Sequence, residues 1–277
     1  MSPDPRPIRR TLDDREARAE AELLDRAERD RCQIRQTTTA HPGMTITDAY
    51  AVQAAWQQLR ESRGETLVGH KIGLTSRAMQ TAMNITTPDS GFLTDAMVFR
   101  ADSELVAGDF LDPRVEVELA FVLGRDLQGT QVTVDEVLEA TDHVTPAVEL
   151  IAARTFRTDP DTGRTRTVID TIADNAADAG IVAGGRRVAP GEVDLRWVAA
   201  LLYRNGVVEE TGVAAGVLDH PARGIAWLAR RYAEHELKLE AGHTILAGSF
   251  TRPVKIEAGD ELRFDYGELG SFSLSFA

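Results

Sequence analysis

The stretch PRVEVELAFVL, residues 113–123, combines a strand pattern with two carboxylates. Successive side chains of a strand point to opposite faces, so Val115 and Val117 share one face and Glu116 and Glu118 share the other. The two glutamates are separated by roughly 7 Å along the backbone, which lets both side chains reach one cation. Hard divalent ions such as Mg²⁺ or Mn²⁺ prefer oxygen ligands of this kind. The alternative interpretation is a solvated sheet face, where polar residues alternate in the same way.

A third carboxylate lies inside a second apolar run, AVELI at residues 147–151. Burial of Glu149 in such a run is unfavourable unless the carboxylate is paired or binds a metal. A capping box at Thr133 and Glu136 predicts a short helix that ends near His143 and connects the two strands. Together with the two glutamates of the first strand, Glu149 predicts a divalent-metal site.

A lysine stands inside a further predicted strand, LVGHKIGLT at residues 67–75. If Lys71 is partly desolvated, its pKa is lowered and the amine can move protons at neutral pH. The alternative is an edge-strand lysine that limits aggregation, and both interpretations stay open. We interpret the neighbouring His70 as a core or surface residue.

Composition restricts the classes of function. The chain has 277 residues, of which 43% are hydrophobic and 27% charged, which is typical of a globular protein. A formal net charge of −13 argues against nucleic acid or an anionic membrane as the main partner. The single cysteine, Cys32, forms no intramolecular disulfide, and the sequence has no apolar stretch of membrane-spanning length and no signal peptide. We therefore expect a cytoplasmic protein with no membrane partner.

The elements that position these residues fall into two predicted parts. Residues 1–64 comprise a tail and a helical portion, with one helix over residues 11–35 and a second from Thr47 to about Ser62. Residues 65–277 are expected to form a β-rich, metal-binding catalytic domain. The sequence thus predicts an α+β fold.

Within the second part, turn residues and alternating runs indicate further elements. Residues 88–91, PDSG, predict a turn, and Arg204-Asn205-Gly206 predicts a β-hairpin. The runs at 262–266 and 272–276 alternate like strands, and a helix is expected after Pro221.

Several polar segments carry candidate substrate ligands. The polar stretch 154–166 is long for a loop of a compact domain and predicts a lid or an interface segment. Asp174 and Asn175 either bind substrate or serve turn chemistry. The cluster SFTR, residues 249–252, follows an apolar strand and has the hydroxyl and guanidinium groups to receive a carboxylate. The sequence contains no Walker loop, dinucleotide-binding glycine motif or nucleophile-elbow serine, so nucleotide cofactors and acyl-serine chemistry are unsupported.

As a set, the motifs GHKIGLT at 69–75, PRVEVE at 113–118 and AVEL at 147–150 resemble the hydratase/decarboxylase branch of the fumarylacetoacetate hydrolase superfamily. The resemblance extends from about Leu23 to the C-terminus and includes LLYRNGV at 201–207 and GSFTRP at 248–253. It implies a mixed β-barrel or roll with a helical N-terminal portion, a Mg²⁺ or Mn²⁺ cofactor and a homo-oligomer. It also implies that the metal ligands are Glu116, Glu118 and Glu149 and that the catalytic lysine is Lys71.

The same resemblance implies a reaction. A hydratase of this branch is expected to add water to 2-oxohept-4-ene-1,7-dioate, through its dienol, in the degradation of an aromatic compound. The metal is expected to hold the 1-carboxylate and 2-oxo group while Lys71 moves a proton. The substrate-binding candidates are Arg77, Asp174, Ser249, Thr251 and Arg252, with Arg154 and Arg157 as further receivers for the distal carboxylate. The candidates for activating water are Asp89, His143 and Asp174.

Three other activities stay open. A 2-oxopent-4-enoate hydratase and a 2-oxo-3-hexenedioate decarboxylase would share the same metal ligands, so the ligands cannot separate them. The third is a non-catalytic binding subunit on the same scaffold, although such a protein would be expected to lose Lys71 or a carboxylate.

Overall fold

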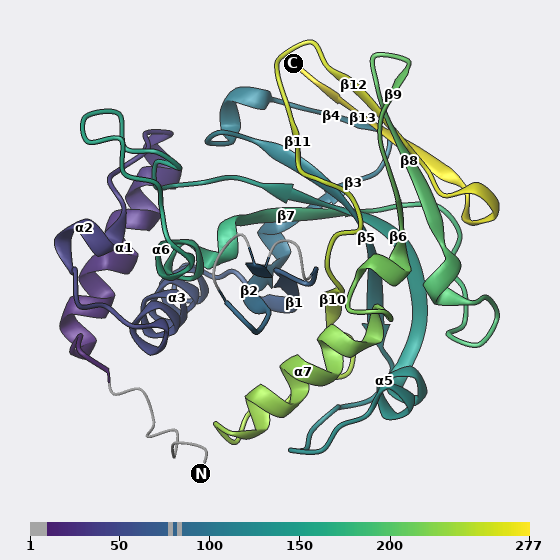
Figure 1. The fold of residues 1–277 in the computed structure, drawn as a ribbon, viewed down its shortest axis with the longest axis horizontal. Coiled ribbons are helices and arrows are strands. Elements are labelled where there is room, and N and C mark those ends of the chain that lie inside the picture. The colour runs from purple at the N-terminus through teal and green to yellow at the C-terminus, as the bar shows by residue number, and fades with distance from the viewer. Residues whose placement is uncertain (1–9, 77–79, 82–84) are drawn as a thin grey trace.

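The computed structural model describes residues 10–76, 80–81 and 85–277, and its strands form two sheets (Figure 1). In this described part, the larger sheet has eight strands in the order β2-β1-β10-β5-β6-β7-β3, with β11 paired to β5. The smaller sheet has five, in the order β4-β13-β12-β8-β9. The strands of the larger sheet are β1 (Leu67–Gly73), β2 (Asp89–Thr94), β3 (Val98–Arg100), β5 (Arg114–Leu123), β6 (Thr141–Ile151), β7 (Asp178–Ala183), β10 (Thr244–Leu246) and β11 (Val254–Lys255). Those of the smaller sheet are β4 (Ser103–Leu105), β8 (Ala199–Arg204), β9 (Val207–Val213), β12 (Glu261–Asp265) and β13 (Ser271–Phe276).

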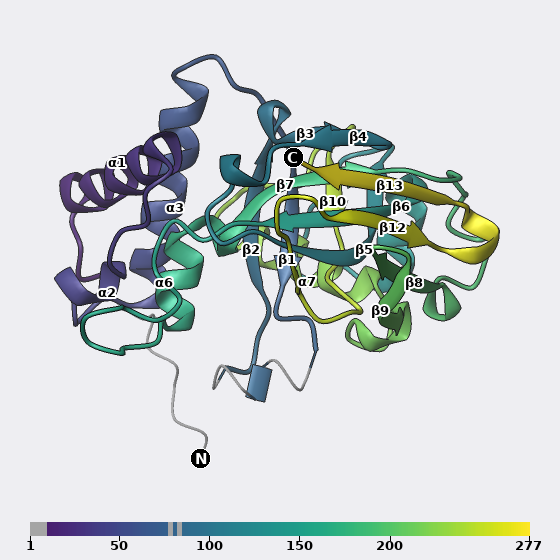
Figure 2. The same cartoon turned by 90° about the horizontal axis from the view of Figure 1, so that it is seen from above.

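Helices lie on two sides of the sheets. The helices are α1 (Asp14–Asp30), α2 (Thr37–Ala40), α3 (Ile46–Glu61), α5 (Val134–Ala140), α6 (Val168–Ala173) and α7 (Ala222–Ala233). Short 3₁₀ turns are η1 (Asp95–Met97), η2 (Ala107–Asp109), η3 (Asn175–Ala177), η4 (Leu195–Trp197), η5 (Ala214–Gly216) and η6 (Gly267–Leu269). Figure 2 shows α1, α2, α3 and α6 gathered beside the sheets, at the left of the view.

The N-terminal helical portion begins its helices with capping boxes and packs on the larger sheet. Asp13 caps α1 and Thr45 caps α3, and in each case the residue three positions on returns the hydrogen bond. Trp56 of α3 and Leu24 of α1 are buried in one apolar cluster with Phe92 of β2. The expected helical portion is confirmed. The division of the chain into residues 1–64 and 65–277 stays a prediction.

The main core lies between the two sheets. Val115 and Val117 of β5 are fully buried there, in the same cluster as Phe264 of β12 and Phe272 of β13. The larger sheet curls so that the opposite face of β5 is also enclosed (Figure 1). The expected α+β fold, with a mixed, curled sheet and an N-terminal helical portion, is confirmed.

Two local expectations are wrong, and one of the two open interpretations of Lys71 is excluded. Residues 88–91 were expected to form a turn, but β2 begins at Asp89, where the segment pairs antiparallel with β1. The helix before β6 ends at Ala140 rather than near His143, and β6 begins at the next residue. Lys71 is not on an edge strand, because β1 lies between β2 and β10.

The expected hairpin is confirmed. Asn205 and Gly206 have positive φ angles of 53° and 80°, the backbone that a two-residue connection between β8 and β9 needs. Among the described residues, no helix has the length and apolar character needed to cross a membrane.

Candidate active site

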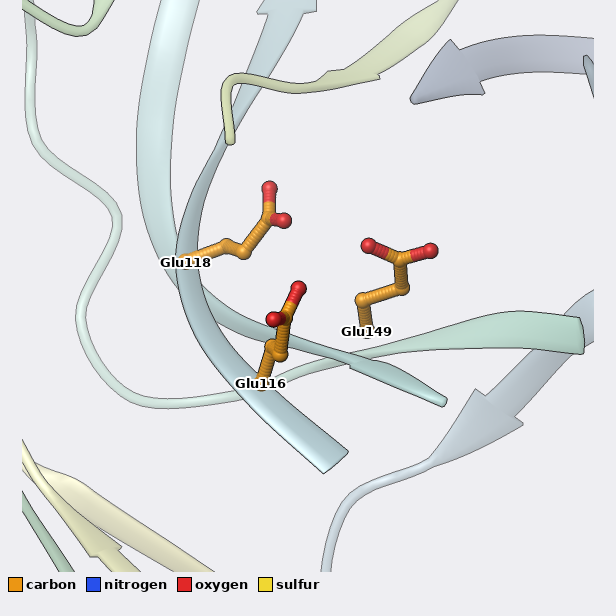
Figure 3. A group of neighbouring side chains, drawn as sticks. All are labelled: Glu116, Glu118 and Glu149. Atoms are coloured by element: carbon orange, nitrogen blue, oxygen red, sulfur yellow. The ribbon is translucent and has the colours of Figure 1, made fainter. Parts of the chain in front are cut away.

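Three glutamate side chains converge at the centre of the larger sheet. Glu116 of β5 and Glu149 of β6 are register partners across the antiparallel pair, and Glu118 lies two residues further along the same face of β5. One carboxylate oxygen from each lies within 4.8 Å of the others. Figure 3 shows the three carboxylates pointing toward one another. The strand alternation therefore brings together the set that the sequence predicts.

These carboxylates are buried and short of hydrogen-bond donors. Glu118 and Glu149 are fully buried and Glu116 is half-buried. The Gly248 N–H donates to Glu118 Oε2 at 2.8 Å. Within the described residues, no group donates a hydrogen bond to Glu118 Oε1 or Glu149 Oε2. The solvated-face interpretation is therefore wrong for these residues.

Burial and mutual repulsion disfavour the ionised forms of the glutamates. Burial, followed by the charge of Glu149, raises the pKa of Glu116 to about 8. Burial and the charges of Glu149 and Glu116 raise the pKa of Glu118 well above its usual value. Three converging acids, two of them fully buried with unused oxygens, fit a hard divalent cation.

Lys71 contributes a cation beside the three glutamates. Its Nζ lies 3.0 Å from Glu149 Oε1, and 5% of its side chain is exposed. Its position on β1 faces Gly91 of β2, where the absence of a Cβ leaves room for the lysine side chain: a Cβ would lie 3.2 Å from Lys71 Cγ. A Cβ on Gly73 would lie 2.2 Å from Asp89 Oδ1 and 3.1 Å from Lys71 Nζ. The two glycines thus open the space that the polar groups fill.

The second interpretation of Lys71, a pKa lowered by burial, is also wrong. Burial by itself lowers this pKa, but the surrounding carboxylates outweigh burial and raise it. Glu149 has the largest of these effects, followed by Asp89 and Asp178. The amine is therefore held in its ammonium form by its acidic neighbours.

Two aspartates extend the acidic surroundings of Lys71. Asp89 is 2% exposed and Asp178 1% exposed, and burial raises the pKa of both. In the part of the chain that the structure describes, Asp89 Oδ1 and Asp178 Oδ2 have no hydrogen-bond partner. Sequence reasoning named Asp89 but missed Asp178, whose only signal was an acid beside the apolar run at residues 179–183.

Ser249 and Thr251 lie against β5 between the two glutamates of that strand. The Val117 N–H donates to Thr251 Oγ1 at 3.1 Å, and Ser249 Oγ donates to the Val117 carbonyl at 3.3 Å. The two hydroxyls thereby attach the segment after β10 to the strand that carries Glu116 and Glu118.

Other expected site residues lie apart from the glutamates or outside the described residues. Asp174 Oδ1 is paired with Arg154 Nε at 2.5 Å, and both side chains are buried. Arg252 is paired with Glu210 of β9 at 2.6 Å, with 84% of its side chain exposed. Arg77 lies outside the described residues.

His143 and Arg157 differ in their distance from the site. His143 is six residues before Glu149 on β6, which places their backbones about 20 Å apart. Arg157 is paired with Asp112 and lies close enough to Glu116 for its charge to oppose the rise in the pKa of that glutamate.

A family model, fumarylacetoacetate (FAA) hydrolase C-terminal, matches residues 64–276. The chain belongs to the fumarylacetoacetate hydrolase family. One family member, the 2-oxo-hept-4-ene-1,7-dioate hydratase of Escherichia coli, is 55% identical over 256 residues, which cover 92% of this chain and 96% of that protein. The 2-hydroxyhexa-2,4-dienoate hydratase of Comamonas testosteroni is 37% identical over 241 residues, covering 86% of this chain and 89% of that protein.

A solved structure of the same family has the same fold. The 4-oxalocrotonate decarboxylase from Pseudomonas putida G7, complexed with magnesium and adipate, superimposes with a TM-score of 0.92. It is 34% identical and covers 97% of this chain and 100% of that chain. The family therefore includes both hydratases and decarboxylases close to this chain.

Proposed function

We propose that this chain is a divalent-metal-dependent hydro-lyase that adds water to 2-oxohept-4-ene-1,7-dioate and forms 4-hydroxy-2-oxoheptanedioate. The observation that carries the proposal is the 55% identity, over 92% of the chain, to the Escherichia coli hydratase of that name. The reaction would serve the meta-cleavage degradation of an aromatic compound. The four residues that this chemistry requires, the three glutamates and Lys71, lie together in the structure.

The proposed cofactor is Mg²⁺, or Mn²⁺, held by Glu116, Glu118 and Glu149. Two observations support it: buried carboxylate oxygens without donors, and the magnesium complex of the related decarboxylase. When bound, such an ion supplies Lewis acidity toward the 1-carboxylate and 2-oxo oxygens of the substrate.

Lys71 is the proposed proton carrier. Its ammonium form, favoured by the acids around it, is the form that donates a proton. Donation to carbon 5 of the dienol, with loss of the 2-hydroxyl proton, converts the diene into an α,β-unsaturated ketone. Water then adds with its oxygen at carbon 4 and a proton at carbon 3, so the atoms of one water molecule are gained.

Asp89 is the proposed base for the attacking water. It lies beside Lys71, as the space left by Gly73 shows, and its Oδ1 has no hydrogen-bond partner among the described residues. The other two candidates are less suited, because His143 is about 20 Å along the strand from Glu149 and Asp174 is paired with Arg154. A homo-oligomer and a cytoplasmic location are part of the proposal from sequence.

A spectrophotometric assay tests the proposal. Metal-stripped protein is mixed with the conjugated seven-carbon dienol diacid, with and without Mg²⁺. The five-carbon dienol and 2-oxo-3-hexenedioate are assayed in parallel. We expect Mg²⁺-dependent loss of the diacid chromophore with a 4-hydroxy-2-oxo diacid as product. If only the five-carbon dienol reacts, the proposed substrate is wrong. If the six-carbon diacid releases CO₂, the protein is a decarboxylase and not a hydratase. Inactivity on all three compounds would reject an enzyme of this class.

A further inference from the structure

Three arginines lie near the acidic residues of the site, and the proposed chemistry does not account for them together. Arg114 begins β5 and shares the face of Glu116, because the two are two residues apart on one strand. Arg157 and Arg166 are neighbours on a segment, residues 155–166, that we call the arginine hairpin. The Arg166 N–H donates to the Arg157 carbonyl at 2.9 Å, and the next pair of residues inward forms a β-bridge.

The arginine hairpin is fixed against the N-terminal helical portion. Thr155 forms a β-bridge with Ile34, and Gln36 Nε2 donates to the carbonyls of Phe156 and Arg164 at 3.0 Å each. The segment expected to be a lid or an interface thus forms an interface within the chain. Its backbone, which carries Arg157 and Arg166, is held in place by these contacts.

The three guanidinium groups have donors without acceptors. In the described part of the chain, Arg114 Nε, Arg157 Nη2 and Arg166 Nη1 are buried and make no hydrogen bond. Only 9% of the Arg166 side chain is exposed, so water does not readily replace the missing acceptor.

Nearby carboxylates do not neutralise this cluster. Asp112 is shared, since it is paired with Arg157 and lies 3.9 Å from Arg114. Asp174 lies 3.8 Å from Arg166 Nη1 and is already paired with Arg154. Burial, and then the like charge of Arg157, lower the pKa of Arg166 to about 10.

The cluster adjoins the proposed metal site. The charge of Arg157 acts on Glu116, and that of Arg166 acts on Asp89, in each case opposing the rise of the carboxyl pKa. Along this face of β5 the order is Glu118, Glu116 and Arg114. The acidic part of the site is therefore followed by a basic part.

We propose that Arg157 and Arg166 of the arginine hairpin, with Arg114, bind the distal carboxylate of a dicarboxylic substrate whose 2-oxo acid end faces the glutamates. This inference rests on the proposed function for the identity of the substrate. Arginine suits the role because its planar group donates two parallel hydrogen bonds to a carboxylate. Arg154 and Arg252, considered from sequence, are engaged by Asp174 and Glu210 and do not offer comparable free donors. The cluster would favour diacids over monoacids of the same length.

Binding of two unreactive probes tests the inference without catalysis. Calorimetry with Mg²⁺-loaded protein compares heptanedioate with heptanoate, which lacks only the second carboxylate. We expect the wild-type protein to prefer heptanedioate, and Arg157→Met and Arg166→Met each to weaken heptanedioate binding about 10-fold or more. Heptanoate affinity should be unchanged. Arg164→Met is the matched control, because Arg164 lies on the same hairpin but its guanidinium contacts Thr38.

The outcomes separate this inference from the proposed function. Equal affinity for the two probes, or diacid affinity unchanged in both variants, overturns the distal site. Equal losses for both probes also overturn it, since they indicate a structural role. Arginine-dependent diacid binding without turnover of any dienol would support the site and reject the hydratase. The last outcome supports both the distal site and the hydratase. In it, the wild-type protein prefers the seven-carbon dienol, and both arginine variants lose this preference while they react with the five-carbon dienol as before.

Discussion

Glu116 and Glu149 are direct partners across β5 and β6, so two carboxylates face each other inside the larger sheet. Like charges at directly opposed positions destabilise a sheet, and burial adds a desolvation penalty. The hydroxyl of Tyr266 donates to the carbonyls of Glu118 and Ala147 and holds the two strands together at this place. The fold therefore tolerates a local repulsion at the position where a divalent cation would relieve it.

Replacing Glu118 with Gln should stabilise the metal-free protein and remove metal binding. The amide is neutral and its oxygen can still accept from Gly248, so we expect the free energy of unfolding to rise by about 1 kcal/mol or more. Mg²⁺ affinity should fall about 100-fold, so that the ion no longer raises the melting temperature. Calorimetry and thermal unfolding with and without Mg²⁺ measure both effects. Glu104→Gln, at an exposed position on β4, is the control, and a variant that kept full Mg²⁺ affinity would contradict the ligand assignment.

Replacing Lys71 with Met should abolish turnover without weakening metal binding. Loss of a proton carrier typically lowers kcat by about 10² to 10⁴. Because Lys71 is a cation 3.0 Å from Glu149, its removal should leave Mg²⁺ affinity unchanged or increased. Steady-state kinetics and Mg²⁺ titration measure the two quantities, with the exposed Lys255→Met as control. Retention of wild-type kcat would remove Lys71 from the mechanism.

A single methyl group at Gly73 should disturb the site. The Cβ of Gly73→Ala would lie 2.2 Å from Asp89 Oδ1, so the carboxylate must move, and Lys71 Nζ is also within 3.1 Å. We expect kcat to fall about 10-fold or more, because small displacements of reacting groups are costly. Gly43→Ala is the matched control, since no atom lies within 4 Å of its Cβ. If kcat is the same in both variants, catalysis does not depend on the observed positions of Asp89 and Lys71.

The part of the site that could be predicted from sequence is the part built on local patterns. Alternation along one strand placed Glu116 and Glu118 on a common face, and an acid inside an apolar run marked Glu149. A short helix connects the two strands, and their antiparallel register places Glu149 directly opposite Glu116. The three carboxylates converge for this reason.

The remaining features depend on contacts between distant segments. Asp89 was placed in a turn because Pro88 and Gly91 are typical turn residues, yet pairing with β1 makes the segment a strand. The sign of the Lys71 pKa shift depends on acids from four other strands, which burial alone does not reveal. Arg166 is 50 positions from Glu116 along the chain, and its hairpin is held against the helical portion with its charge close enough to act on Asp89.

Asp174→Asn should reduce stability more than it changes substrate affinity. Asp174 is fully buried and paired with Arg154, and breaking such a pair leaves an uncompensated charge, at a cost of about 3 kcal/mol or more. Urea unfolding measures the loss, and KM is measured at a temperature where the variant stays folded. A large increase in KM with unchanged stability would instead assign Asp174 to the substrate.

Acid should destabilise the protein partly through His70. Burial, and then the nearby His243, lower the pKa of His70 from 6.5 to about 3. Between pH 6.5 and about pH 3, the imidazole binds a proton in the unfolded chain but not in the folded chain. The free energy of unfolding therefore decreases as the pH falls below 6.5. At pH 5 this group alone removes about 2 kcal/mol relative to pH 7. His70→Gln, which can still accept from the Tyr232 hydroxyl, should flatten the curve of unfolding free energy against pH, whereas the exposed His235→Gln should not. Denaturant unfolding between pH 5 and 7 measures the slopes, and parallel curves for wild type and His70→Gln would show that His70 is not kept neutral by the fold.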